Sequence, residues 1–140
     1  MRKSILFIVL ISLLHCTQAQ VSDNFTDGNF TANPTWIGNT ADWIVNPAFQ
    51  LQSNNNIANS TFYLSTASTL ATTAQWDFYC NLSFKPSGAN FTDVFLTASA
   101  SNLSLITTTG YFVRIGNTQD EISLYKKDVS GVVTKIIDGV

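Results

Sequence analysis

Residues 76–84 read WDFYCNLSF, and they carry the clearest secondary-structure pattern in the chain. Every second side chain in this stretch is apolar, so these residues would share one side of a strand: Trp76, Phe78, Cys80, Leu82 and Phe84. On a helix, Phe78 would lie about 200° around the axis from Trp76, and the apolar stripe would vanish. The pattern therefore predicts a strand whose apolar side faces the core, with Cys80 as a buried thiol.

Similar strand patterns lie on both sides of this segment. Residues 42–52 contain two short apolar runs separated by Pro47, which predicts two short strands around a kink. Further strands are predicted at residues 61–66, 92–99, 110–115, 121–126 and 132–137. Convincing helical stretches are missing after residue 20. Many short strands with turns rich in Asn, Gly, Ser and Thr indicate an all-β fold, an antiparallel β-sandwich or jelly roll.

The first 19 residues have the pattern of an export signal. Arg2 and Lys3 precede an apolar run over residues 5–14, and Thr17 and Ala19 supply the small residues before a cleavage point at Gln20. The apolar run is shorter than the roughly 20 residues that a membrane-spanning helix needs. We expect residues 1–19 to be a signal peptide and residues 20–140 to be one domain, secreted or at the cell surface, without a transmembrane segment.

The composition argues against several classes of partner. The formal net charge is −2, and only 11% of the residues are charged, compared with about a quarter in ordinary proteins. Loss of Arg2 and Lys3 with the signal peptide would make the charge more negative. Because no basic stripe is present to bind phosphates, the sequence predicts no nucleic-acid partner.

Histidine and cysteine are almost absent from the predicted domain. His15 and Cys16 both lie in the signal peptide, which leaves Cys80 alone and no histidine. A disulfide within the chain, a Ser-His-Asp triad and a histidine-containing zinc site are therefore excluded. The alternative that Cys16 is lipidated lacks the small residue expected just before it.

Two patterns could form binding sites. Asp23 and Asp27 are candidate calcium ligands, although isolated aspartates more often stabilise turns, so no cofactor is otherwise expected. Another set of side chains would lie on the outer face of a sheet if their strands are neighbours, and could bind a sugar: Asp77, Tyr79, Asn81, Phe112, Arg114 and Tyr125. Alternatively, this face only forms cross-strand pairs or contacts another domain.

Two motifs indicate a family. Residues 23–30 read DNFTDGNF and are followed by Pro34, Thr35 and Trp36, while GYFVRIG at 110–116 precedes EISLYK at 121–126. This pattern resembles concanavalin A-like (laminin G-like) β-sandwich domains. The chain also resembles the N-terminal segment of secreted surface proteins of Bacteroidetes type, some of which carry a lamin-tail domain.

The resemblance includes glycoside hydrolases whose signature strand reads Glu-hydrophobic-Asp-x-x-Glu. In this chain Glu121 is present, but Ser123 and Lys126 replace the other two acids. Retaining hydrolysis needs two carboxyl groups about 5 Å apart. We therefore expect no enzymatic activity from this motif.

The resulting expectation is a non-catalytic module for binding or adhesion, with a polysaccharide or glycoconjugate as the favoured ligand. The alternatives are a structural spacer or assembly module of a larger surface protein, and a fragment of a glycoside hydrolase. Because Asp138 and Gly139 give a turn signal with no strand after it, we expect a sandwich that is incomplete at its C-terminus and further domains downstream.

Overall fold

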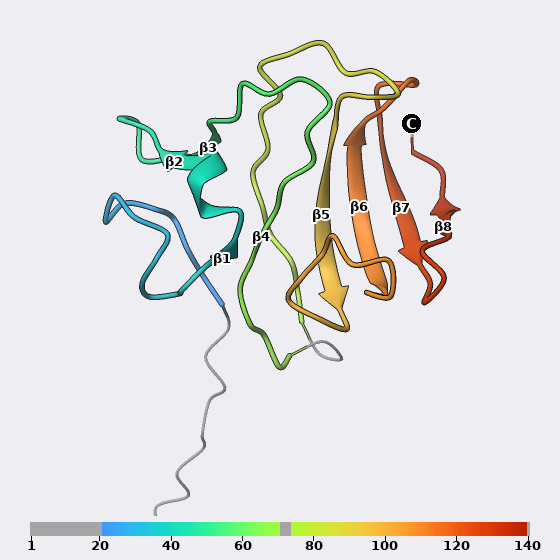
Figure 1. Cartoon of the computed structure of the whole chain (residues 1–140), viewed down its shortest axis with the longest axis horizontal. Helices are drawn as coiled ribbons and strands as arrows, with labels where there is room; N and C mark the ends of the chain where they lie inside the picture. The colour runs from blue at the N-terminus through green and yellow to red at the C-terminus, as the bar shows by residue number, and fades with distance from the viewer. Residues whose placement is uncertain (1–20, 71–73, 140) are drawn as a thin grey trace, which may run out of the picture.

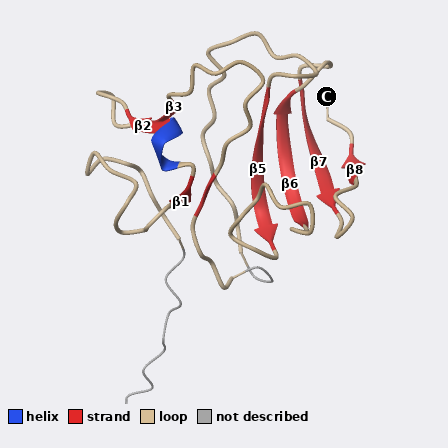
Figure 2. Ribbon diagram, viewed as in Figure 1, coloured by secondary structure: helices blue, strands red, loops and turns tan. Residues whose placement is uncertain are grey.

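The computed structural model describes residues 21–70 and 74–139, and within them the regular structure is almost entirely antiparallel β-strand. The prediction of an all-β fold is confirmed. The predicted signal peptide lies outside the described residues. Figures 1 and 2 show an ordered four-stranded sheet on one side and a region with short strands and long loops on the other.

The four-stranded sheet is a simple meander. Its strands are β5 (Phe91–Ala98), β6 (Gly110–Gly116), β7 (Glu121–Lys127) and β8 (Val133–Ile137), and each pairs with its neighbour in sequence. All four strands were predicted, and so was the β6–β7 pairing. The turn between β6 and β7 contains Asn117 and Asp120 at positive φ, a conformation that Asn and Asp tolerate better than most residues.

The remaining strands are very short. β2 (Trp43–Val45) and β3 (Leu51–Ser53) form a hairpin that confirms the two strands predicted around Pro47. The β2–β3 turn is held by Asn46, whose side-chain oxygen accepts hydrogen bonds from the backbone N–H groups of Ala48 (2.9 Å) and Gln50 (3.1 Å). β1 (Ile37–Gly38) pairs with β4 (Leu64–Ser65), which lies within the predicted segment 61–66, and a 3-10 turn, η1 (Thr40–Asp42), precedes β2.

The prediction of a strand at residues 76–84 is wrong. The structure assigns no strand there, and the segment runs between β4 and β5 in the view of Figure 1. Trp76 is 42% exposed and Phe78 and Phe84 are each 46% exposed, so the predicted buried face is not buried. Cys80 is also exposed. Alternation shows which side chains share a side, but a strand forms only where a partner supplies ladder hydrogen bonds.

The best-packed side chains lie on one face of the meander, here called the inner face. Phe112 is 1% exposed and Tyr125 is 6% exposed. Part of this face is covered by the loop between β5 and β6, to which Lys127 is bonded through the carbonyl oxygens of Leu103 and Leu105. The expectation that Phe112 and Tyr125 line an open outer face is therefore wrong.

The opposite face of the meander, here called the outer face, is mainly aliphatic and more open. Tyr111 is 43% exposed, and Ile122 is 62% exposed. Cross-strand register places Val113 opposite both Val94 and Leu124 on this face. Among residues 21–70 and 74–139, no helix has the length and apolar character that a bilayer crossing requires.

Candidate functional site

Three aromatic rings form a row across the inner face. Register places Phe95 opposite Phe112 and Phe112 opposite Tyr125. The ring centroids of Phe95 and Phe112 are 4.9 Å apart, and those of Phe112 and Tyr125 are 5.5 Å apart with an interplanar angle of 9°. Stacked cross-strand rings bury a large apolar area and stabilise the pairing of their strands. This row fixes the position of the polar side chains beside it.

Arg114 lies next to the aromatic row and forms a two-point ion pair with Asp93. Its Nε and one terminal nitrogen each donate a hydrogen bond of 2.8 Å to the Asp93 carboxylate. The guanidinium carbon lies 3.8 Å from the centroid of the Phe91 ring and 5.0 Å from that of Tyr125. Burial opposes the charge, but the hydrogen bond and charge of Asp93 outweigh it and raise the pKa of Arg114. The cation is held between rings and is already neutralised.

A second polar network joins β7 to the residues after β8. Lys135 donates hydrogen bonds to Glu121 and to Asp138, the latter at 2.6 Å. Ser123 donates to Glu121 at 2.8 Å and accepts from the backbone N–H of Gly139 at 2.8 Å. Glu121 and Ser123 are buried. Glu121, the acid of the hydrolase-like motif, is thus paired with a lysine and a hydroxyl group, an arrangement that ties residues 135–139 to β7.

A large open cleft of about 2200 Å³ is lined by much of the described chain before β5, by both sides of β5, and by Phe112 and Arg114 on the inner face. Five of the six side chains predicted from the sequence as a ligand site line this cleft: Asp77, Tyr79, Asn81, Phe112 and Arg114. The sixth, Tyr125, is not part of the lining and stacks against Phe112. The two groups differ in exposure, because Tyr79 is 81% exposed whereas Phe112 is nearly inaccessible.

Most of the accessible rings of the cleft come from residues 76–84, which form no strand, and Phe49 in the β2–β3 turn adds one more. Trp76, Phe78 and Tyr79 all line the cleft and all are exposed. Asp77 lies among them and accepts a hydrogen bond of 2.9 Å from the side-chain amide of Gln75. Rings beside hydrogen-bonding groups are the usual composition of a ligand-binding surface. This part of the cleft, rather than the buried row, is therefore the accessible candidate site.

Sequence reasoning missed the partners of Arg114. Asp93 and Phe91 were not among the candidate residues, although alternation places Asp93 on the same side of its strand as Phe95. The signal that could have identified them is register: the turn at residues 117–120 pairs Arg114 with Ser123, and β5 then places Asp93 opposite Arg114.

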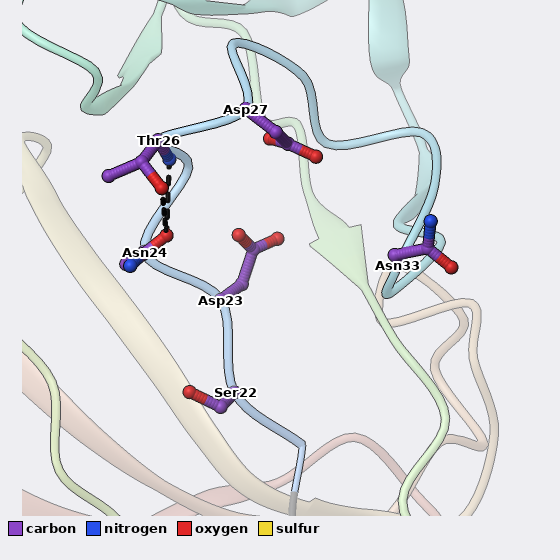
Figure 3. A pocket seen from close by; sticks show the side chains of 6 residues that line it. All are labelled: Ser22, Asp23, Asn24, Thr26, Asp27 and Asn33. Carbon is purple, nitrogen blue, oxygen red and sulfur yellow. Dashed lines mark hydrogen bonds between the residues drawn. The ribbon is translucent and has the colours of Figure 1, made fainter.

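The two candidate calcium ligands lie together in a separate small pocket. Asp23 and Asp27 line a hollow of about 300 Å³ with Ser22, Asn24, Thr26 and Asn33 (Figure 3). Their oxygens already accept hydrogen bonds.

Asp23 accepts from the Phe25 N–H and the Trp36 indole N–H, each at 2.8 Å. Asp27 accepts from the backbone N–H of Asn29 at 3.2 Å and from its side-chain amide at 2.7 Å. Among the described residues, no group of three or more His, Cys, Asp or Glu side chains could hold a metal ion. The pocket is therefore described as a hydrogen-bonded turn, and calcium binding stays a prediction.

Comparisons with protein-family models, curated proteins and solved structures found no match to this chain.

Proposed function

We propose that this chain is a non-catalytic, secreted or cell-surface module that binds carbohydrate, with a β-sandwich of the concanavalin A-like type. The observation that carries the proposal is the open cleft, whose lining includes the exposed rings of Trp76 and Tyr79 and the carboxylate of Asp77. Sugars present apolar C–H faces that stack on aromatic rings and hydroxyl groups that bond to carboxylates and amides. The signal-peptide pattern of residues 1–19 supports export.

The lining of the cleft fits this chemistry better than it fits catalysis. Several side-chain amides face the cleft and offer both donors and acceptors: Asn46, Gln50, Gln52, Asn55, Asn59, Asn81 and Asn90. The carboxylate of the hydrolase-like motif, Glu121, does not line the cleft and is bonded to Lys135. The proposed ligand is therefore held and released unchanged.

The test is binding of the purified protein to a panel of soluble polysaccharides, measured by affinity gel electrophoresis. Tyr79→Ala removes the most exposed ring of the cleft and should weaken binding about tenfold, the loss expected for one stacked ring. Tyr111→Ala is the matched control, because Tyr111 lies on the outer face and does not line the cleft. Failure of the folded protein to bind any member of the panel would refute the proposal.

A second candidate function is assembly with another domain or subunit, and the outer face of the meander favours it. Ile122 is 62% exposed and Ile137 is 59% exposed, on the same face as Val113 and Leu124. Exposed apolar patches of this kind mark interaction surfaces. Under this alternative, Ile122→Asp would abolish association measured by light scattering, while polysaccharide binding would be absent both before and after the change.

A further inference from the structure

The charged side chains that line the cleft are few and are unequally paired. The two cations are Arg114 and Lys127. Among the acids, Asp93 is bonded to a cation, whereas Asp23 and Asp77 are bonded to neutral groups. Whether the cleft attracts or repels a charged ligand depends on which of these charges are already neutralised.

Both cations already donate hydrogen bonds within the protein. Arg114 directs its Nε and one terminal nitrogen at the Asp93 carboxylate, each at 2.8 Å, and its flat face is stacked on Phe91. Lys127 donates to the carbonyl oxygen of Leu105 at 2.7 Å and to that of Leu103 at 3.4 Å. Each of these contacts would have to break, or be shared, before an acidic ligand could be bound by either side chain.

Within the part of the chain that the structure describes, Asp77 and Asp23, like Lys127, are bonded only to neutral groups. Among the described residues, no Lys or Arg forms an ion pair with Asp77 or Asp23. Asp77 accepts a hydrogen bond from the amide of Gln75, and Asp23 accepts bonds from the Phe25 and Trp36 N–H groups, all of which are neutral donors. Arg114 and Asp93 cancel each other, which leaves the two negative charges of Asp77 and Asp23 against the one positive charge of Lys127. The net charge of the lining is therefore negative and disfavours a ligand that carries carboxylates or sulfates.

The volume of the cleft also indicates how large a ligand it can hold. Its volume of about 2200 Å³ is larger than the range of roughly 300–1,000 Å³ that holds a small molecule. A volume of this size has room for an extended chain of several sugar units.

We infer that the ligand is a neutral polysaccharide and that the cleft discriminates against acidic ones. This inference rests on the proposed carbohydrate-binding function and adds a selectivity to it. The selectivity comes from the charge of Asp77 and from the ion pair that holds Arg114 on Asp93. Because stacking and neutral hydrogen bonds then hold the ligand, its affinity should be nearly independent of salt.

The experiment compares neutral and acidic polymers at low and at high ionic strength. A β-glucan and a galactomannan are the neutral probes, and alginate and polygalacturonate are the acidic ones. The expected result is retention by at least one neutral polymer, with less than about a twofold change between the two salt concentrations, and at least about tenfold weaker retention by both acidic polymers at low salt.

Charge reversal in the cleft sharpens the comparison. Asp77→Lys should raise retention by alginate about tenfold at low salt, and high salt should remove this gain. Asp120→Lys is the matched control, because Asp120 is exposed in the β6–β7 turn and does not line the cleft; this variant should bind both kinds of polymer as the unchanged protein does.

The outcomes separate the two proposals. Salt-sensitive binding that is tighter to alginate or polygalacturonate than to the neutral polymers would overturn the neutral-ligand inference and leave carbohydrate binding intact. An equal effect of Asp77→Lys and Asp120→Lys on alginate binding would also overturn it, since the charge at the cleft would then not be responsible. No retention by any of the four polymers, with the fold intact by circular dichroism, would overturn the function and the inference together.

Discussion

Different interactions hold the meander of β5–β8 and the described residues before it. The meander has strands of 8, 7, 7 and 5 residues whose backbone groups pair in ladders, with one register shift between β5 and β6 and one between β7 and β8. The strands β1–β4 have only two or three residues each. There, Asn and Asp side chains bond nearby backbone N–H groups, as Asn46 does in the β2–β3 turn and Asn55 does with Ile57. Side-chain turns fix local shape, but they bury little apolar surface.

This difference places stability and proposed function in separate parts of the molecule. The buried aromatic row and the Arg114–Asp93 pair belong to the meander, whereas the exposed rings of Trp76 and Tyr79 belong to the segment without ladders. Ligand-binding segments are commonly drawn from the least protected parts of a fold, since they must stay accessible.

Hydrogen exchange of backbone amides should show the largest contrast. The amide of Val113 lies in the central strand β6, whereas that of Tyr79 lies in a segment with no assigned strand. We expect the free energy of opening at Val113 to exceed that at Tyr79 by about 5 kcal/mol, because central strands exchange by global unfolding and loops exchange locally. Equal protection of the two amides in exchange monitored by NMR would show that residues 76–84 belong to the same cooperative unit as the sheet.

Truncation of a phenylalanine side chain should lower the free energy of unfolding much more in the meander than in residues 76–84. Phe112→Ala empties a position that is 1% exposed and stacked on both sides, so its free energy of unfolding should fall by about 3–5 kcal/mol. Phe78→Ala is the matched change in a side chain that is 46% exposed, and it should cost about 1 kcal/mol. Urea denaturation measures both. Comparable losses would mean that Phe78 is packed in solution, as its sequence pattern suggested.

The same contrast explains how far the sequence could predict this fold. Segments 92–99, 110–115, 121–126 and 132–137 became strands because each pairs with the next strand in sequence. Residues 76–84 alternate as clearly, but alternation does not identify a partner, and none pairs with them in the described structure. For β6 the pattern showed which side chains share a face, yet it did not show that the face with Phe112 and Arg114 would be the covered one.

The candidate site was predictable to a similar extent. The grouping of Phe112, Arg114 and Tyr125 follows from pairing across β6 and β7, and the structure brings the three together. The commitment of Arg114 to Asp93 depends on β5 register, which is set by the long connection over residues 99–109 and a β-bulge between Phe95 and Thr97. The predicted strands gave the approximate length of that connection, but a connection of this length does not fix the register, and the bulge could not be read from local patterns.

A double-mutant cycle on the ion pair should give a smaller effect than the loss of Phe112. Asp93→Asn and Arg114→Gln each break the two-point contact, in which the side chains are 23% and 18% exposed. We expect a coupling free energy of about 1–2 kcal/mol, between the values of fully exposed and fully buried pairs. Urea denaturation of the two single variants and the double variant measures this coupling free energy. Additive losses would indicate that Arg114 is free to meet a ligand, which would weaken the inference of a neutral one.

The smallest effect should come from the link between β8 and Asp138. The hydrogen bond and charge of Lys135 hold the pKa of Asp138 below its ordinary value of 3.8, and the pKa of Lys135 is raised by its bonds to Asp138 and Glu121. A lowered carboxyl pKa contributes stability above the ordinary value, and that contribution is lost as pH falls through the folded value. A raised lysine pKa contributes stability below the ordinary lysine value, and that contribution is lost only in strong alkali.

Asp138→Asn should therefore lower the melting temperature by a constant small amount between about pH 5 and pH 9, and the difference from the unmodified protein should shrink in acid. If calorimetry shows the same difference at about pH 2 as at neutral pH, the charge of Asp138 does not hold the end of the sheet. The C-terminal residues would then depend on the Ser123–Gly139 hydrogen bond, which does not involve Asp138.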